Sequence, residues 1–83
     1  PSPSIGTARL RYGLPRAARV DLEVFDVQGR RLATLMSGDQ EAGWHDVVWD
    51  GRTDVGGRAG AGLYFARFRA EGRTFQQRVV WLR

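Results

Sequence analysis

Hydrophobic and polar positions alternate along several short stretches of the chain. In residues 8–14, apolar side chains occupy every second position, with two arginines between them. Residues 19–26 repeat the arrangement, with Val20, Leu22 and Val24 on one side and acidic side chains on the other. A period of two is typical of a strand that buries one face. Both stretches therefore predict half-buried antiparallel strands.

Four further stretches, bounded by turn-forming residues, also predict strands. They are residues 30–35, 44–50, 63–70 and 74–83. Turn-forming residues separate the six stretches at Val27-Gln28-Gly29, Ser37-Gly38-Asp39, the glycine-rich residues 51–62, and Glu71-Gly72-Arg73. No stretch has a 3.6-residue period over the length of a helix. The pattern predicts an all-β fold, either a β-sandwich or a small barrel.

Gly29, which precedes two arginines, raises the question of a phosphate-binding loop. Such a loop needs several backbone N–H groups converging at the N-terminus of a helix. The residues after Gly29 have a strand pattern instead. We predict that Gly29 supplies a positive φ in a tight hairpin turn and that Arg30 and Arg31 begin the returning strand.

Asp50 and Asp54 lie four residues apart in the glycine-rich loop, which makes them weak candidates for a calcium site. Their spacing does not match an Asp-x-Asp-x-Asp-Gly loop, and Arg52 and Arg58 stand beside them. The alternative is that Asp50 accepts backbone N–H bonds and orders a turn, with Gly51 at the bend. We expect this turn role, and no metal or other cofactor.

The charge of the chain is uneven, and all 13 basic residues are arginine. Residues 1–35 carry six arginines and three acids, and residues 58–83 carry six arginines and one acid. Residues 36–57 carry one arginine and five acids. Clustered arginine is the electrostatic signature of nucleic-acid binding, but the net charge of +4 is modest and an acidic centre repels phosphate. We expect arginines on outward strand faces and no nucleic-acid partner.

Composition excludes several kinds of site. The chain has no cysteine, so disulfides and thiolate sites are excluded, and its single histidine cannot build a multi-histidine metal site. No apolar run approaches the 18 or so residues that a spanning helix needs. The 83 residues suffice for one domain, residues 1–83. Because the sequence starts at Pro1, we expect a module of a longer protein.

Four motifs in order resemble one known family. They are YGLP, VDLEVFDVQGRRLATL, AGWHDVVWDGRTDVGG and GLYFARF, and they cover nearly the whole chain. Together they resemble the Ig-like domain shared by the flagellar hook-capping protein FlgD and by C-terminal domains of secreted bacterial proteins, including type IX secretion sorting domains. The most specific residues of the resemblance are Asp26 and Gly29, the Trp49-Asp50-Gly51 corner, and Gly62 with Tyr64.

The resemblance implies an Ig-like or fibronectin-III-like antiparallel β-sandwich of about six to seven strands. It also implies a C-terminal module of an exported bacterial protein, secreted or on the cell surface. The chain departs from sorting domains at both ends: it opens with PSPSIGTARLRY rather than an Asn-Pro-Phe-Asn-Pro type of segment, and it closes with RVVWLR, with arginine in place of the usual lysine.

Apolar residues on outward strand positions form a candidate interaction surface. If His45, Val47 and Trp49 face the core, as the resemblance suggests, then Trp44 and Val48 face outward. Likewise, Tyr64, Ala66 and Phe68 facing inward leave Leu63 and Phe65 outward. The last strand is apolar on both faces. The full candidate set is Trp44, Val48, Leu63, Phe65, Val80, Leu82 and Arg83. Such a surface would dock the preceding domain or another subunit, although isolated exposed apolar residues are also normal.

The sequence does not predict an enzyme. No Ser-His-Asp arrangement would be brought together by the strand pattern, and the carboxylates fall on outward positions or in turns. We expect His45 to be a partly buried strand residue rather than a ligand or base. The resulting hypothesis is a non-catalytic module for sorting, surface anchoring or assembly. It would contact the export machinery or other subunits through strand edges. The alternative is a self-associating module of a surface filament or a scaffold like the flagellar hook cap.

Overall fold

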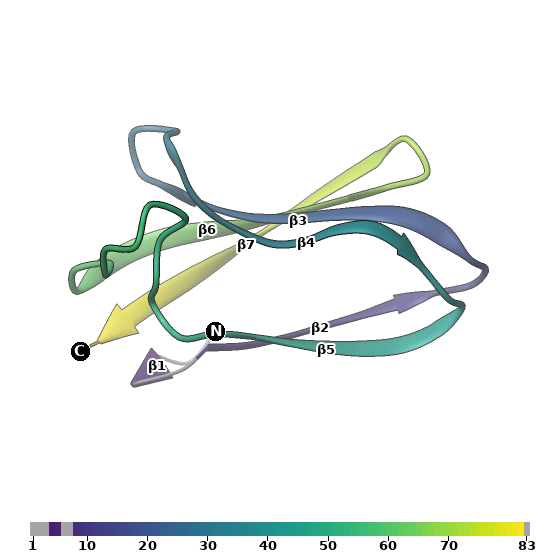
Figure 1. Ribbon diagram of the computed structural model, residues 1–83, viewed down its shortest axis with the longest axis horizontal. Helices are drawn as coiled ribbons and strands as arrows, with labels where there is room; N and C mark the ends of the chain where they lie inside the picture. The colour runs from purple at the N-terminus through teal and green to yellow at the C-terminus, as the bar shows by residue number, and fades with distance from the viewer. Residues whose placement is uncertain (1–3, 6–7, 83) are drawn as a thin grey trace.

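The computed structural model describes residues 4–5 and 8–82, and these form seven strands with no helix among them (Figure 1). The strands are β1 (Ser4–Ile5), β2 (Ala8–Leu14), β3 (Ala18–Asp26), β4 (Arg31–Gln40), β5 (Gly43–Trp49), β6 (Gly62–Ala70) and β7 (Arg73–Leu82). The predicted all-β, Ig-like sandwich is confirmed.

The strands form two layers, as Figure 1 shows. One layer is a five-stranded sheet in the order β1-β7-β6-β3-β4, and the other is the two-stranded sheet β2-β5. Neighbouring strands are antiparallel except β1, which pairs with the end of β7 in parallel. Each sheet buries the face that its alternating apolar residues supply, because successive side chains point to opposite faces.

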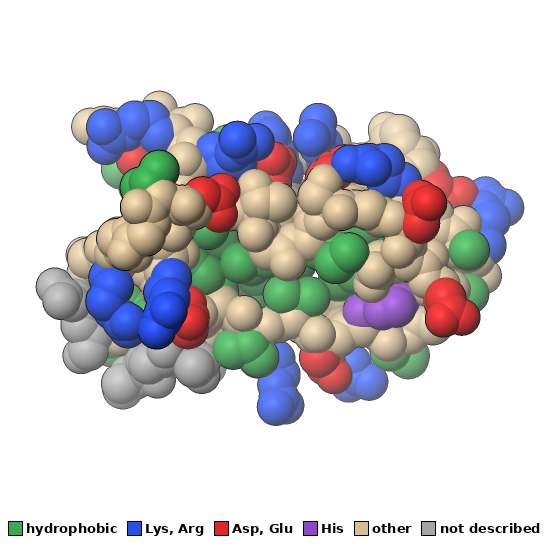
Figure 2. Space-filling model, viewed as in Figure 1, with side chains coloured by type: hydrophobic (Ala, Val, Ile, Leu, Met, Phe, Trp, Pro, Cys, Tyr) green, Lys and Arg blue, Asp and Glu red, His purple; other side chains and the backbone are tan. Residues whose placement is uncertain are grey.

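The core lies between the two layers. Trp49 of β5 is 2% exposed, and its ring packs 4.8 Å from that of Trp81 and 5.5 Å from that of Tyr64. Figure 2 shows hydrophobic side chains in the band between the layers and charged side chains over the outer surfaces. The buried apolar residues that pack into one cluster are Ala8, Leu10, Leu22, Val24, Ala33, Trp49, Ala59, Ala66, Val79 and Trp81.

The turn predicted at residues 37–39 is wrong. These residues belong to β4, where Ser37 pairs with Asp21 and Gly38 with Val20. Gly38 has a φ of 147° but pairs with Val20 within β4, so it does not mark a reversal. The two register shifts between β3 and β4 lie nearer the β3–β4 turn, at Leu22/Glu23 and Val24/Phe25. The chain reverses at residues 41–42 instead. The short strand β1 was not predicted at all.

Candidate interaction surfaces

The β3–β4 turn is closed by Asp26. Its Oδ1 accepts hydrogen bonds from the backbone N–H groups of Gln28 and Arg30, both at 2.9 Å, and its Oδ2 accepts one from Arg30 Nε at 2.9 Å. The backbone N–H of Arg30 is the main cause that holds the pKa of Asp26 below its usual value, and the Arg30 side chain adds to it. Gly29 has a φ of 83°. The turn therefore uses these donors internally rather than offering them to a phosphate.

The Trp49-Asp50-Gly51 corner links the core to the glycine-rich loop. The indole N–H of Trp49 donates to the Arg52 carbonyl at 3.0 Å, and Asp50 Oδ1 accepts the Arg52 backbone N–H at 3.0 Å. Gly51 has a φ of 85°, and a Cβ there would overlap the Trp81 indole. Glycine is therefore required at this position for both conformation and space.

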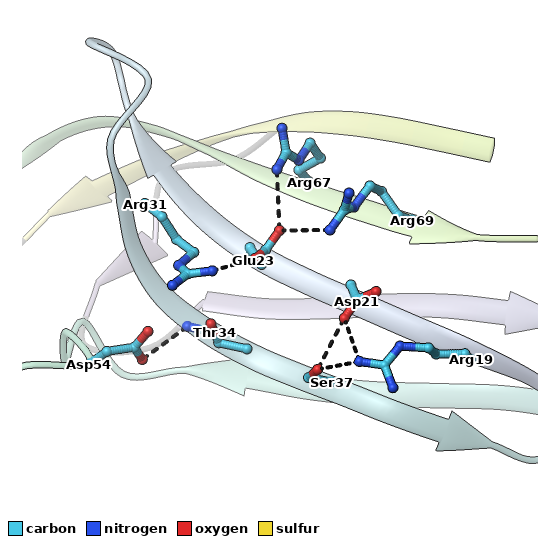
Figure 3. A network of polar contacts seen from close by, with 9 residues as sticks. All are labelled: Arg19, Asp21, Glu23, Arg31, Thr34, Ser37, Asp54, Arg67 and Arg69. Atoms are coloured by element: carbon cyan, nitrogen blue, oxygen red, sulfur yellow. Dashed lines mark hydrogen bonds and ion pairs between the residues drawn. The ribbon is translucent and has the colours of Figure 1, made fainter. Parts of the chain in front are cut away.

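Asp54 binds the edge of β4. Its backbone N–H donates to the Leu32 carbonyl at 2.9 Å, and its Oδ1 accepts the Thr34 backbone N–H at 3.0 Å (Figure 3). Asp50 and Asp54 thus each accept a different backbone N–H rather than sharing a ligand. Within residues 4–5 and 8–82, no group of three or more His or acidic side chains is placed to hold a metal ion.

A buried carboxylate lies on the outer face of the five-stranded sheet. Glu23 of β3 is 6% exposed, and Arg31, Arg67 and Arg69 approach its carboxylate oxygens at 3.1, 3.3 and 3.7 Å (Figure 3). The Arg67 guanidinium also lies 4.2 Å from the centre of the Phe25 ring. Sequence reasoning placed Glu23 outward but exposed; it is buried because side chains from both neighbouring strands cover it.

A second polar group lies on the same face, beside Glu23. Asp21 Oδ1 accepts the Ser37 hydroxyl at 3.0 Å and an Arg19 guanidinium N–H at 3.3 Å (Figure 3). The Ser37 hydroxyl, followed by Arg19, holds the pKa of Asp21 below its usual value. The arginines of this face are thus largely matched by carboxylates of the same sheet.

The predicted apolar interaction residues separate onto two surfaces. Trp44 and Val48 lie on the outer face of the two-stranded sheet, 71% and 53% exposed. The Arg11 guanidinium lies 5.0 Å from the Trp44 ring. The remaining described members lie on the outer face of the five-stranded sheet: Leu63, Phe65, Val80 and Leu82. Of these four only Leu82 is exposed; the rest are half-buried. Arg83 lies outside the described residues.

The remaining candidate residues serve the loop and the core. The Tyr64 hydroxyl donates to the Gly60 carbonyl at 2.7 Å, and Gly62, with a φ of 153°, begins β6. The half-buried His45 ring stacks on Tyr12 at 5.1 Å, and its Nε2 lies 2.7 Å from a backbone carbonyl. These contacts are those of a strand residue. Within residues 4–5 and 8–82, the structure has no helix long and apolar enough to cross a membrane.

Comparison with known proteins gives a consistent result. The model of the FlgD Ig-like domain family matches residues 3–73. The crystal structure of FlgD from P. aeruginosa superposes with a TM-score of 0.64 at 27% sequence identity, over 87% of this chain. The match covers 57% of the FlgD chain, so the domain corresponds to just over half of that structure. A search of curated proteins gave no match.

Proposed function

The chain belongs to the FlgD Ig-like domain family, and from this premise we propose that it is a non-catalytic structural module of a scaffold related to the flagellar hook cap. The match of the family model to residues 3–73 carries the proposal. It is supported by the superposition on FlgD over most of the chain. The family is structural rather than enzymatic. The module's role is therefore to bind other chains, not to transform a substrate.

The polar groups support a structural role. Four carboxylates accept hydrogen bonds from, or form ion pairs with, residues of the same domain: Glu23, Asp21, Asp26 and Asp54. Carboxylates used in this way stabilise turns and strand faces, which is a structural role rather than that of a catalytic acid or base. These structural contacts support a non-catalytic module.

We also place the domain in a longer exported bacterial protein, secreted or exposed on the cell surface, with residues 1–83 as one module. The support is the family to which it belongs and the fact that the domain spans only 57% of the FlgD chain. The partners would then be the neighbouring domain and other subunits of the assembly, contacted through strand edges and exposed apolar side chains.

Shearing surface structures from the producing bacterium tests the proposal. An antibody against the domain should detect it in the sheared, assembled fraction, and deleting the domain from the genome should prevent that assembly. A strain carrying Val55→Ser, a change at a fully exposed loop residue, is the control and should assemble normally. Recovery of the protein only from the cell interior, with normal surface assembly in the deletion strain, would reject the proposal.

A sorting or anchoring role is the second candidate, favoured by the terminal strand. In β7, Val79 and Trp81 are buried in the core, whereas Val80 and Leu82 lie on the outer face. Deleting residues 79–83 would remove core side chains, so a fair test changes only the outer pair. Val80→Ser with Leu82→Ser should leave the domain folded. Retention of this folded double variant inside the cell would support a sorting role. Normal export of the variant would reject that role.

Nucleic-acid binding is the third candidate function, and we propose that the domain does not bind nucleic acid. The arginines near Glu23 and Asp21 already form ion pairs with these carboxylates. A mixed-sequence oligonucleotide should therefore bind only weakly at physiological salt. Fluorescence anisotropy checks this, and a submicromolar affinity that falls steeply with salt would overturn it.

A further inference from the structure

An open groove lies between strand β2 and the edge of strand β7. We call it the β2–β7 groove; its volume is about 300 Å³, and its lining includes Leu10, Tyr12, Leu22, Ala66, Phe68 and Phe75. A second hollow of about 400 Å³ shares Gly13, Phe68 and Phe75 with it and continues it toward the β6–β7 turn. The groove exists because a two-stranded sheet is narrower than the five-stranded sheet it faces.

Both walls of the β2–β7 groove are strand edges. β2 pairs with β5 alone. β7 pairs with β6 along its length and with β1 only at Trp81 and Leu82. Within the described residues, the backbone of residues 73–80 therefore has no strand on its second side. An unpaired edge of this length is a template for an added strand, and β1 shows that the β7 edge accepts one.

A row of rings crosses the sandwich and ends in the groove. It runs from His45 to Tyr12, 5.1 Å between ring centres, then to Phe68 at 4.8 Å and to Phe75 at 6.3 Å. Phe75 is the last ring of the row and is 56% exposed. An apolar side chain placed in the groove would pack against Phe75 and the core residues beneath it, with a gain proportional to the apolar area removed from water.

Unmatched positive charge lies along the β7 edge, on both faces of the sheet. β7 carries Arg73 and Arg78 and no acidic residue. Neither arginine forms an ion pair within the part of the chain that the structure describes. By contrast, Arg16, which lines the same hollow as Arg73, is bound by Glu71 at 2.6 Å. Arg73 lines the second hollow, whereas Arg78, two residues before Val80, lies on the outer face of the sheet beside Phe65. Unmatched arginines on the two faces of an open edge select an added strand that carries acidic residues at its flanks.

We propose that the β7 edge and the β2–β7 groove bind an extended segment of another polypeptide, apolar at alternate positions and acidic at its flanks. The segment adds a strand to the five-stranded sheet, its alternate side chains fill the groove over Phe75, and its flanking carboxylates pair with Arg73 and Arg78. This inference rests on the proposed function, because it names the surface through which the module assembles.

A designed peptide tests the proposal on the whole chain. The probe is about ten residues long, with valine alternating with threonine and two glutamates at each end. Titration into the ¹⁵N-labelled protein should shift the backbone amide resonances of residues 74–79 and 10–13 and slow amide exchange along β7. Phe75→Ala should weaken binding about tenfold. Because Phe75 is half exposed, this variant should stay folded, which circular dichroism checks.

Controls separate this surface from others. Trp44→Ala removes a more exposed aromatic side chain from the opposite sheet and should leave the affinity unchanged. A peptide with lysines in place of glutamates should bind at least about fivefold more weakly. Absence of binding, or equal binding by Phe75→Ala, overturns the proposal. Shifts of the same amides with protein concentration alone would identify a second copy as the occupant and also overturn it. Because no parent assembly is measured, these failures remain distinct from failure of the proposed function.

Discussion

The two edges of the five-stranded sheet differ in how they are finished. The β4 edge is irregular: its register with β3 shifts twice, and Asp54 occupies the Leu32 carbonyl and the Thr34 N–H. The β7 edge is regular: it pairs with β6 from Gly62 to Ala70 without a shift, and among the described strands β1 covers only its end. Bulges and capping loops are the means by which proteins prevent edge-to-edge association. The fold protects one edge and leaves the other available.

The turns that lead to these two edges differ in the same sense. The β3–β4 turn is tied by three hydrogen bonds to the Asp26 carboxylate. The β6–β7 turn instead has two residues with positive φ, Glu71 at 53° and Gly72 at 76°. Two such residues in a two-residue loop match the twist of the strands and keep them in register. The β3–β4 turn thus relies on hydrogen bonds to a carboxylate of the turn itself, whereas the β6–β7 turn relies on its backbone geometry and on the ion pair of Glu71 with Arg16.

The largest expected effect is that of Trp49→Ala, which removes a core side chain that contacts both β7 and the loop covering the β4 edge. Trp49 packs on Trp81 of β7 and holds the start of the loop that carries Asp54. Its truncation should cost about 3–5 kcal/mol of unfolding free energy, enough to unfold much of a marginally stable domain. Chemical denaturation measures it. A loss below about 1 kcal/mol would contradict the buried position of this ring.

Asp54→Ala should have an intermediate effect confined to the β4 edge. It removes the acceptor of the Thr34 N–H and should cost about 1 kcal/mol. Amide exchange at Thr34 should accelerate, and the protein should associate more readily at high concentration because the edge is uncovered. The matched control is Asp39→Ala, which removes an exposed acid within β4 itself. An equal effect of the two variants would show that Asp54 does not protect the edge.

Phe75→Ala should have a smaller effect on stability, about 0.5 kcal/mol, because the side chain is already half exposed at the open edge. Phe68→Ala, one step inward along the same row of rings, should cost several times more. Denaturation of the two variants side by side measures the difference. A cost at Phe75 equal to that at Phe68 would mean that the β7 edge is as closed as the core.

The effect of Asp26→Asn should depend on pH. The folded pKa of Asp26 is lowered, so its contribution to stability is complete above its unfolded pKa of about 3.9 and is lost as the pH falls through the lower folded value. The wild type should therefore be the more stable protein at pH 6, and the difference should shrink toward pH 2. Thermal melts across this range test it. A difference independent of pH would contradict a charged role for Asp26.

The sequence predicted most of the fold because the strands bury one face each. Strand patterns bounded by turn residues identified the six longer strands, and the family resemblance together with strand alternation assigned Trp44 and Val48 to the outer face of their strand. The strand β1 was not predicted, because two residues are too few to show an alternating pattern and the strand pairs with residues near the C-terminal end of the chain. The turn predicted at Gly38 was wrong: glycine favours turns, but Gly38 lies within strand β4 with a positive φ.

The surfaces were less predictable, because they depend on which strands become neighbours. Asp54 was recognised as a loop acid, yet its partner Thr34 is twenty residues away. Likewise, burial of Glu23 requires Arg67 from β6, which only the pairing of β3 with β6 brings near. The β2–β7 groove follows from the unequal widths of the two sheets, a property that no single stretch of sequence expresses.

The parallel pairing of β1 with β7 determines how the domain responds to a pull. Force applied to the chain before β1 and after β7 acts along these two strands in opposite directions. Parallel strands pulled in this way are loaded in shear, so the contacts at Trp81 and Leu82 resist together instead of opening one after another. The patch is short, but Trp81 anchors it in the core against Trp49. This terminal patch is therefore the first strand pairing on which such a load acts.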